Sequence, residues 1–379
     1  MQFKKTIINI ITIFVSLICL FLLFEIIFRL FNIEPGIFSQ PDPLLGVTLI
    51  PGAKYQNNSE GFSKGTINSH GLRDKEHSYS KPDNTFRIVI LGDSFTEALQ
   101  VDIDSAYHQH LSRLLNLTNT KKYEIIAMGR SGMGTLEELL WYQREGRKYH
   151  PDIVVCAFYI GNDFRDNSRR LSNVHKRTIL KPFLNQDGSI DNSFIKTREY
   201  RFRKTITPIL RFSRFFTFIM RKIELIQQSK KKQNSIPEFP LDLYILKKNY
   251  DIVWQQALET TAQILRTFNT EVQKDSAKFI VIGIPDSYQI NGATPLSQYS
   301  SSPIDIDLNK PDSVLSDIAT VNGFQYIPLF DCFKTAFEKT GIYYYGFGKM
   351  LGTGHWNEHG HALAAQCIDN ALQKILNNN

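Results

Sequence analysis

The stretch from Arg87 to Thr96 constrains the fold of this chain more than any other. It opens with an apolar run rich in β-branched residues, Ile88-Val89-Ile90-Leu91, which is typical of a buried strand in a parallel sheet. Gly92 ends the run, and residues from Thr96 onward fit the start of a helix. Ser94 therefore lies at a strand-to-helix turn, on the sheet edge where open α/β folds hold their sites. Two interpretations stay open: Ser94 is a nucleophile, or it only caps the helix.

Strand-like and helix-like segments alternate along most of the chain. The predicted strands cover residues 86–91, 123–128, 152–160, 278–284 and 325–329. The predicted helices cover residues 105–116, 135–149, 248–273 and 312–321, with a final helix to about residue 376. This alternation predicts an α/β fold of flavodoxin-like type, a three-layer sandwich with a central parallel sheet.

An uncharged apolar segment, Thr6–Phe24, precedes the globular part and is close to the length that spans a bilayer. Lys4 and Lys5 before it favour a cytoplasmic N-terminus, and no small-residue cleavage site follows it. We expect an uncleaved single-pass transmembrane helix with the catalytic domain outside the cytoplasm. The predicted organisation is an anchor over 1–32, an extended arm over 33–84 and a globular domain over 85–376.

A basic insertion, predicted over 165–247, interrupts the alternation. Residues 165–232 hold eighteen Lys and Arg against five Asp and Glu, interleaved with apolar residues over 209–226. Such a segment fits a basic amphipathic helix on anionic lipid head groups, or a helix packed on the domain with a solvated basic face. Nucleic acid is not an expected partner of an exported domain.

The four cysteines are scattered and show no CxxC spacing. They indicate neither a zinc site nor a disulfide framework, so buried free thiols are expected.

Three further loops fall at the carboxyl ends of predicted strands or near the C-terminus. Gly129–Gly134 offers backbone N–H groups, Gly161-Asn162-Asp163 offers an amide, and the loop around His355 offers a base. With Ser94, these are the parts that acyl transfer needs: a nucleophile, oxyanion donors and a general base.

In this order the motifs resemble those of the SGNH, or GDSL-like, hydrolase superfamily. Gly92-Asp93-Ser94-Phe95, Gly129-x-x-Gly132, Gly161-Asn162-Asp163 and the His355 segment match its four blocks over residues 85–370. The arm and the N-terminal anchor resemble those of membrane-anchored members. The resemblance implies that Ser94 is the nucleophile and His355 the general base. It also implies an oxyanion hole made by Ser94, Gly132 and Asn162.

The chain departs from this pattern at the acid. Members of the superfamily usually have an aspartate two or three residues before the histidine, where this chain has Thr353 and Gly352. Another group can take the place of the aspartate and orient His355, and the candidates are a backbone carbonyl, Asp331 and Glu358. The other interpretations are a slow Ser–His dyad and an inactive site.

The resemblance implies a serine ester hydrolase acting on O-acyl esters of carbohydrate or lipid, without metal or organic cofactor. The His355-Trp356 pair resembles the corresponding pair in relatives that move acetyl groups on exported polysaccharides. A polysaccharide O-acetyltransferase using the same serine is therefore the first alternative. A catalytically degenerate binding module is the second.

Overall fold

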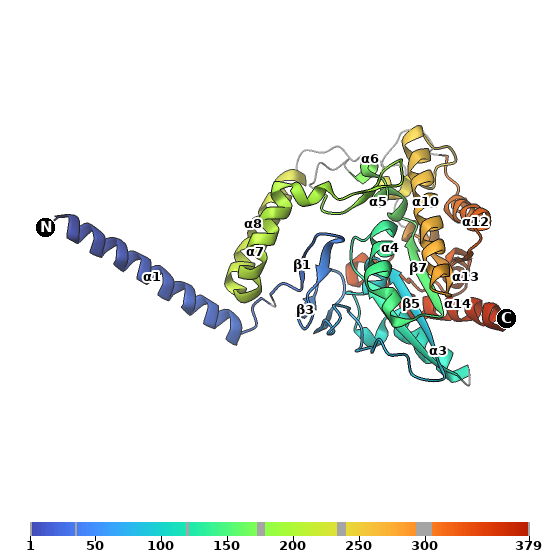
Figure 1. The fold of residues 1–379 in the computed structure, drawn as a ribbon, viewed down its shortest axis with the longest axis horizontal. Coiled ribbons are helices and arrows are strands. Elements are labelled where there is room, and N and C mark those ends of the chain that lie inside the picture. The colour runs from blue at the N-terminus through green and yellow to red at the C-terminus, as the bar shows by residue number, and fades with distance from the viewer. Residues whose placement is uncertain are drawn as a thin grey trace.

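The computed structural model describes residues 2–34, 36–118, 121–172, 179–232, 240–292 and 305–377. Its centre is a sheet of five parallel strands (Figure 1). In chain order these strands are β5 (Thr85–Gly92), β6 (Lys122–Gly129), β7 (Ile153–Tyr159), β10 (Lys278–Ile284) and β11 (Gln325–Pro328). Their spatial order, β6-β5-β7-β10-β11, is the flavodoxin-like order, which confirms the predicted fold class.

Helices cover both faces of the sheet because the strand residues alternate between them. Ile88 and Ile90 of β5 contact the core under one helix layer, and Val89 and Leu91 contact the core under the other. The first layer contains α3 (Tyr107–Thr118), α13 (Phe330–Thr340) and α14 (Glu358–Asn377). The second contains α4 (Thr135–Arg144), α10 (Ile252–Lys274) and α12 (Lys310–Asn322). The predicted helix over 135–149 ends at Arg144 and continues as a 3₁₀ turn over Gly146–Tyr149.

Shorter elements connect these layers. They are α2 (Ser94–Glu97), α5 (Asp163–Asp166), α6 (Arg169–Ser172), β8 (Phe183–Leu184), β9 (Ile190–Asp191), α9 (Leu241–Tyr244) and α11 (Ser287–Asn291).

Residues 39–66 of the predicted arm form two hairpins packed on the domain. One hairpin pairs β1 (Ser39–Asp42) with β2 (Gly46–Leu49), and the other pairs β3 (Lys54–Asn57) with β4 (Ser63–Thr66). Buried polar side chains further along the arm hold it against the domain. Arg73 donates to the carbonyls of Glu97 and Val101, at 2.7 and 2.5 Å, and so ties the arm to the segment that follows β5.

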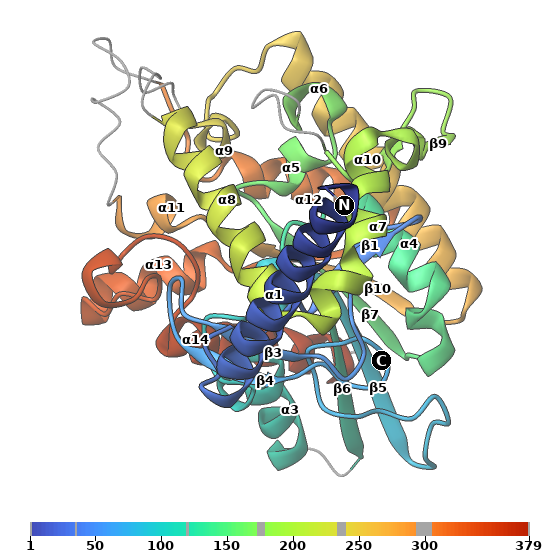
Figure 2. The same ribbon diagram turned by 90° about the vertical axis from the view of Figure 1, so that its left-hand side faces the viewer.

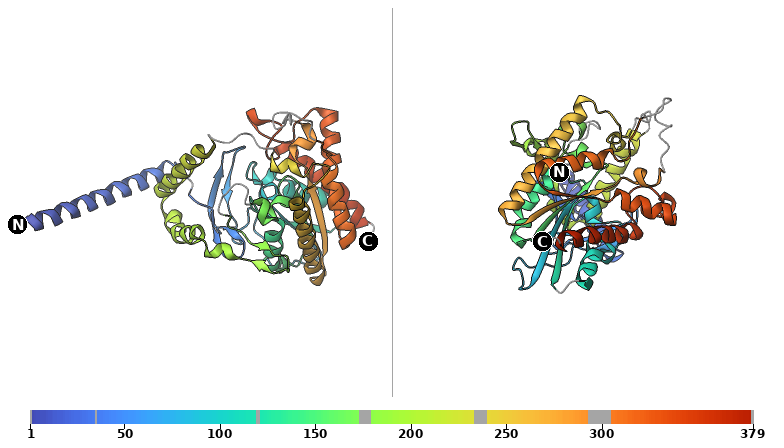
Figure 3. Two further views of the ribbon diagram at one scale, coloured as in Figure 1. Left: turned by 90° about the horizontal axis from the view of Figure 1, so that it is seen from above. Right: turned by 90° about the vertical axis from the view of Figure 1, so that its right-hand side faces the viewer.

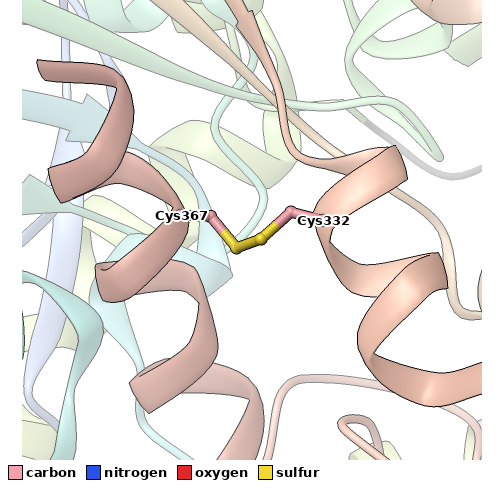
Figure 4. The surroundings of a disulfide bond; sticks show 2 residues. All are labelled: Cys332 and Cys367. Carbon is pink, nitrogen blue, oxygen red and sulfur yellow. A yellow bond between two sulfur atoms is a disulfide. The ribbon is translucent and has the colours of Figure 1, made fainter. Parts of the chain in front are cut away.

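Two of the four cysteines form a disulfide, so the expectation of four free thiols was wrong. Cys332 in α13 bonds to Cys367 in α14 across a Cα–Cα distance of 6.3 Å (Figure 4). The two helices pack side by side in one layer, which brings together residues that lie 35 positions apart in the chain. Cys19 and Cys156 are free.

The N-terminal helix α1 (Gln2–Leu30) is long and apolar enough to cross a membrane. The basic insertion forms two consecutive helices, α7 (Arg198–Phe212) and α8 (Arg214–Lys232). This helix pair lies across the inner end of α1, between α1 and the strands of the arm (Figure 3, left). Seen along α1, α8 lies on one side of that helix and α7 on the other (Figure 2).

Candidate active site

Ser94 is the first residue of α2, directly after the strand β5. The N-cap of α2 is Asp93, whose carboxylate accepts a hydrogen bond from the Phe95 N–H at 2.9 Å. The capping role is therefore filled by Asp93, and the Ser94 hydroxyl is available for another role. Ser94 lies where the strand order reverses between β5 and β7, the usual place for sites in this type of sheet.

His355 contacts Ser94 across a sequence distance of 261 residues. Its Nε2 lies 2.8 Å from the Ser94 Oγ, within hydrogen-bond distance. Aromatic packing holds the imidazole in place: its ring centroid lies 5.1 Å from that of Phe95, and the next residue, Trp356, is fully buried. The structure thus brings together the two residues that the sequence motifs nominate as nucleophile and base.

The acid beside His355 is Glu60, in the turn between β3 and β4. Its Oε2 lies 2.8 Å from His355 Nδ1 and also accepts the His355 backbone N–H at 3.1 Å. Hydrogen bonding from His355 lowers the pKa of Glu60, so this group is a carboxylate at neutral pH. None of the three replacements suggested by the sequence occupies this position. Asp331 and Glu358 lie in the first turns of α13 and α14, and the acid comes instead from the arm.

Gly354 explains how an acid from so far away can reach the histidine. Its φ of +83° lies in the left-handed region that glycine favours. A Cβ at this position would lie 3.0 Å from the Glu60 carboxylate. The glycine-rich loop before His355 contains no acidic residue. Gly354 leaves space in this loop for the carboxylate of Glu60.

The β3–β4 hairpin that carries Glu60 is fixed to the segment that follows Ser94. Arg73 donates through Nε to the Tyr55 hydroxyl of β3 at 2.9 Å and through its guanidinium to the Glu97 carbonyl. Ser63 of β4 donates to the Leu99 carbonyl at 2.6 Å. Because Glu97 and Leu99 lie just beyond Ser94, the hairpin and the serine share one rigid support.

The three candidate oxyanion donors lie on separate loops at the same sheet edge. Within the described residues, the backbone N–H groups of Ser94 and Gly132 donate to no other group. Gly132 has a φ of +75°, a conformation that turns the chain sharply at this point. The Asn162 side chain lies beside the buried Asp93 carboxyl group, whose pKa is raised by burial and lowered in part by this amide.

Two buried glutamates hold the Gly132 loop in position. Glu97 accepts the Ser131 N–H at 2.6 Å, and burial raises the pKa of its carboxyl group. Glu137 accepts the Gly134 N–H at 3.0 Å and binds Arg130 at 2.7 Å. These contacts preorganise a loop that would otherwise be free to move.

His361, later in the His355 segment, has a structural position. His361 is buried, its ring is stacked on Tyr107, and its Nδ1 accepts the Tyr107 N–H at 3.2 Å. Burial lowers the pKa of His361 well below its usual value, so the ring is neutral. Among the described residues, no cluster of three or more His, Cys, Asp or Glu side chains is arranged to hold a metal ion.

A cavity of about 330 Å³ lies beside Gly132. Its lining combines apolar side chains, Val47, Ile179 and Leu180, with charged side chains of both signs. The charged residues are Arg130, Glu137, Asp166, Lys181 and Arg203. Lys181 and Arg203 belong to the insertion predicted from the sequence, which therefore reaches the edge of the candidate oxyanion hole.

A scan for known protein families gives no match, and no curated protein matches the chain. Solved structures with a similar fold include an acetyl xylan esterase, with 13% identity, covering 76% of this chain and 100% of that chain at a TM-score of 0.41. Another is a catalytic mutant of an acetylxylan esterase from Geobacillus stearothermophilus, with 11% identity, covering 75% and 92% at 0.40. A third is the lipase/acylhydrolase from Enterococcus faecalis, with 14% identity, covering 76% and 96% at 0.39. All three TM-scores lie below 0.5.

Proposed function

We propose that this protein is an ester hydrolase that forms an acyl-enzyme on Ser94. The observation that carries the proposal is the continuous chain Ser94–His355–Glu60, joined by two contacts of 2.8 Å. A serine, a histidine and a carboxylate in this order form the constellation that activates a hydroxyl nucleophile on several unrelated folds.

The geometry supports an acyl-transfer mechanism in two halves. The Ser94 Oγ attacks the ester carbonyl while His355 Nε2 takes its proton, and the resulting oxyanion accepts hydrogen bonds from Ser94, Gly132 and Asn162. His355 then protonates the departing alcohol, which leaves the acyl group on Ser94. In the second half His355 deprotonates a water molecule as this water attacks the acyl-serine. His355 then returns the proton to the Ser94 Oγ, which leaves as the carboxylic acid is released. Glu60 holds the His355 Nδ1–H and stabilises the imidazolium that forms in each half.

The proposed substrates are O-acyl esters of a carbohydrate or a lipid. The charged side chains around the cavity beside Gly132 favour the carbohydrate, because they can form hydrogen bonds with its hydroxyl groups.

We place the catalytic domain outside the cytoplasm, anchored by α1. The Cys332–Cys367 disulfide supports this location because such bonds persist in oxidising compartments. The two lysines before the apolar segment support a cytoplasmic N-terminus.

Labelling with a fluorophosphonate probe tests the nucleophile. The probe is expected to modify the wild-type protein and not Ser94→Ala, with Ser112→Ala on α3 as a control that keeps full labelling. Equal labelling of wild type and Ser94→Ala would refute the assignment. A folded wild-type protein that takes no label would favour the degenerate binding module. That interpretation arose because no acid precedes His355 in the sequence, and the contact of Glu60 with His355 argues against it.

The cavity beside Gly132 is also the observation that favours the second candidate function, a polysaccharide O-acetyltransferase. A bound glycan hydroxyl beside the acyl-serine would compete with water, because well-oriented groups reach effective concentrations of about 10⁵ M or more. Supplying an activated acetyl ester with and without candidate polysaccharides, and measuring both free acetate and acetylated glycan, separates the two activities. Dominant transfer that disappears in Ser94→Ala would replace hydrolysis by transfer as the main reaction.

A further inference from the structure

We infer that the helix pair α7–α8 is a membrane-surface element that lies on the head groups of an anionic phospholipid bilayer. This inference concerns an interaction surface and does not depend on the proposed activity.

The start of α8 is fixed to α1 near the end of its apolar stretch. The Glu25 carboxylate of α1 accepts hydrogen bonds from the Ser213 hydroxyl at 2.9 Å and from the N–H groups of Arg214 and Phe215 at 3.2 Å each. Glu25 therefore caps the N-terminus of α8 from another helix, where a carboxylate is favoured. Arg29 pairs with Glu25 at 2.7 Å and also donates to the Phe212 carbonyl, so it joins α7 to the same point.

Aromatic packing extends this attachment. Phe215 stacks on Phe24, with ring centroids 4.9 Å apart, and makes edge contacts with Phe21 and Phe28. Beyond the end of α1, Arg221 of α8 pairs with Glu34 at 2.9 Å. These contacts run along α1 and then past its end. A bilayer crossed by α1 would therefore have its surface at the level of the helix pair.

The helix pair exposes large apolar side chains although it belongs to a folded protein. On α7, Phe202, Ile209 and Phe212 are 52%, 53% and 76% exposed and recur at helical spacing. On α8, Ile219 and Ile223 are 37% and 43% exposed, one turn apart. An apolar stripe of this kind on a helix is typical of proteins that insert shallowly at a lipid interface.

The charge of the same segment selects the lipid. Residues 198–232 include eleven Lys and Arg and only two Glu. Arg201, Lys204 and Arg211 are exposed and form no ion pair with any residue that the structure describes. A basic surface beside exposed apolar side chains matches a membrane surface that carries phosphatidylglycerol or another anionic lipid.

The full-length protein in lipid nanodiscs provides the test, with a tryptophan introduced at Phe212. The native Trp141, Trp254 and Trp356 are buried, so their emission is a constant background measured on the unsubstituted protein. The nanodiscs contain phosphatidylcholine alone or mixed with phosphatidylglycerol, in each case with acyl chains brominated near the head group. The matched control is Val321→Trp on α12, a position that is 83% exposed and lies in the helix layer far from α1.

We expect the bromolipids to remove the added fluorescence of Phe212→Trp and to leave that of Val321→Trp unchanged. Replacing Arg201, Lys204 and Arg211 together by Gln is expected to weaken the quenching in nanodiscs with phosphatidylglycerol and not in those without it. Equal, low quenching at both positions would overturn the inference, because the helix pair would then stand in water. Emission at position 212 that is shifted to the blue without quenching would also overturn it, since a protein partner or a second copy would cover this face.

Discussion

At the scale of single residues, the distinguishing feature of the site is the origin of its acid. Ser94 and His355 lie in segments that the sequence motifs identify, whereas Glu60 lies in the arm, 295 positions before the histidine that it contacts. In a serine triad the acid fixes the histidine tautomer and stabilises the imidazolium, so Glu60 is expected to control turnover more than substrate binding.

Replacing Glu60 by Gln tests this role. The amide keeps the size of the side chain but cannot stabilise the imidazolium, and the corresponding change in a serine protease costs about 10⁴-fold in kcat. We expect ester turnover to fall by several orders of magnitude with little change in KM. Glu358→Gln, three residues after the histidine but not in contact with its ring, is the matched control and should keep wild-type turnover. Full activity of Glu60→Gln would mean that the dyad works without this acid.

Asn162 is expected to donate to the oxyanion, and its replacement by Ala should lower kcat by about 10²–10³-fold. The control is Asn167→Ala in the same loop region, which removes hydrogen bonds to Thr135 and Thr261 and so is expected to lower thermal stability. If the two variants lose turnover equally, and in proportion to their loss of stability, Asn162 has a structural role only.

Sequence reasoning could find most of this site but not its acid. Ser94, Gly132, Asn162 and His355 each follow a strand or precede a helix in a recognisable order, so their proximity follows from the topology of a parallel sheet. Glu60 follows Asn57-Asn58-Ser59 in a segment that resembles an ordinary polar turn. The sequence contained only an indirect signal for the acid. Gly352 and Thr353 stand where an aspartate is usual before the histidine, so an acid, if there is one, had to come from another segment.

At the scale of elements, the arm is an integral part of the domain because buried ion pairs hold it there. His77 of the arm lies 2.8 Å from Glu124 of β6 and 3.2 Å from Asp74. Asp74 is itself buried and accepts the Ala127 N–H of β6 at 2.7 Å. Composition made this segment resemble a linker, since its ordered contacts come from a few long-range polar side chains and not from a periodic apolar pattern.

This cluster predicts a pH dependence of stability. Burial alone would lower the pKa of His77, but hydrogen bonds from it to Asp74 and Glu124 raise it to about 9. A raised pKa in the folded state stabilises the protein fully when the pH is below about 6.5, the pKa of histidine in the unfolded chain. This stabilisation is lost as the pH rises through about 9, the pKa of His77 in the folded protein. The melting temperature of the wild type should therefore fall more steeply between about pH 7 and about pH 10 than that of His77→Gln. Parallel curves for the two proteins would show that the pair contributes nothing to folding.

At the scale of the whole molecule, the arm connects the apolar helix α1 with the candidate active site. The chain leaves α1, passes beside the α7–α8 pair, forms the β3–β4 hairpin and only then enters the sheet (Figures 1 and 3). The same segment therefore joins the domain to α1 and carries Glu60. The parallel sheet and its helix layers were predictable from periodicity, whereas this arrangement depends on tertiary contacts that have no local sequence signal.

The anchor is expected to keep the protein in the membrane. Extraction with alkaline carbonate should leave the full-length protein in the membrane pellet, because a spanning apolar helix is not released by the loss of surface charge. Release into the soluble fraction would show that α1 does not span the bilayer.

The most direct test of the central claim is to trap the acyl-enzyme. The protein is mixed with an activated acetyl ester, quenched in acid within its first turnovers, digested and analysed by mass spectrometry. We predict an acetyl group on the peptide that contains Ser94 in the wild type, and much slower accumulation of that acetyl group in Glu60→Gln. Ester turnover in the wild type with the acetyl group on another residue, or with none on Ser94 at any quench time, would contradict this prediction.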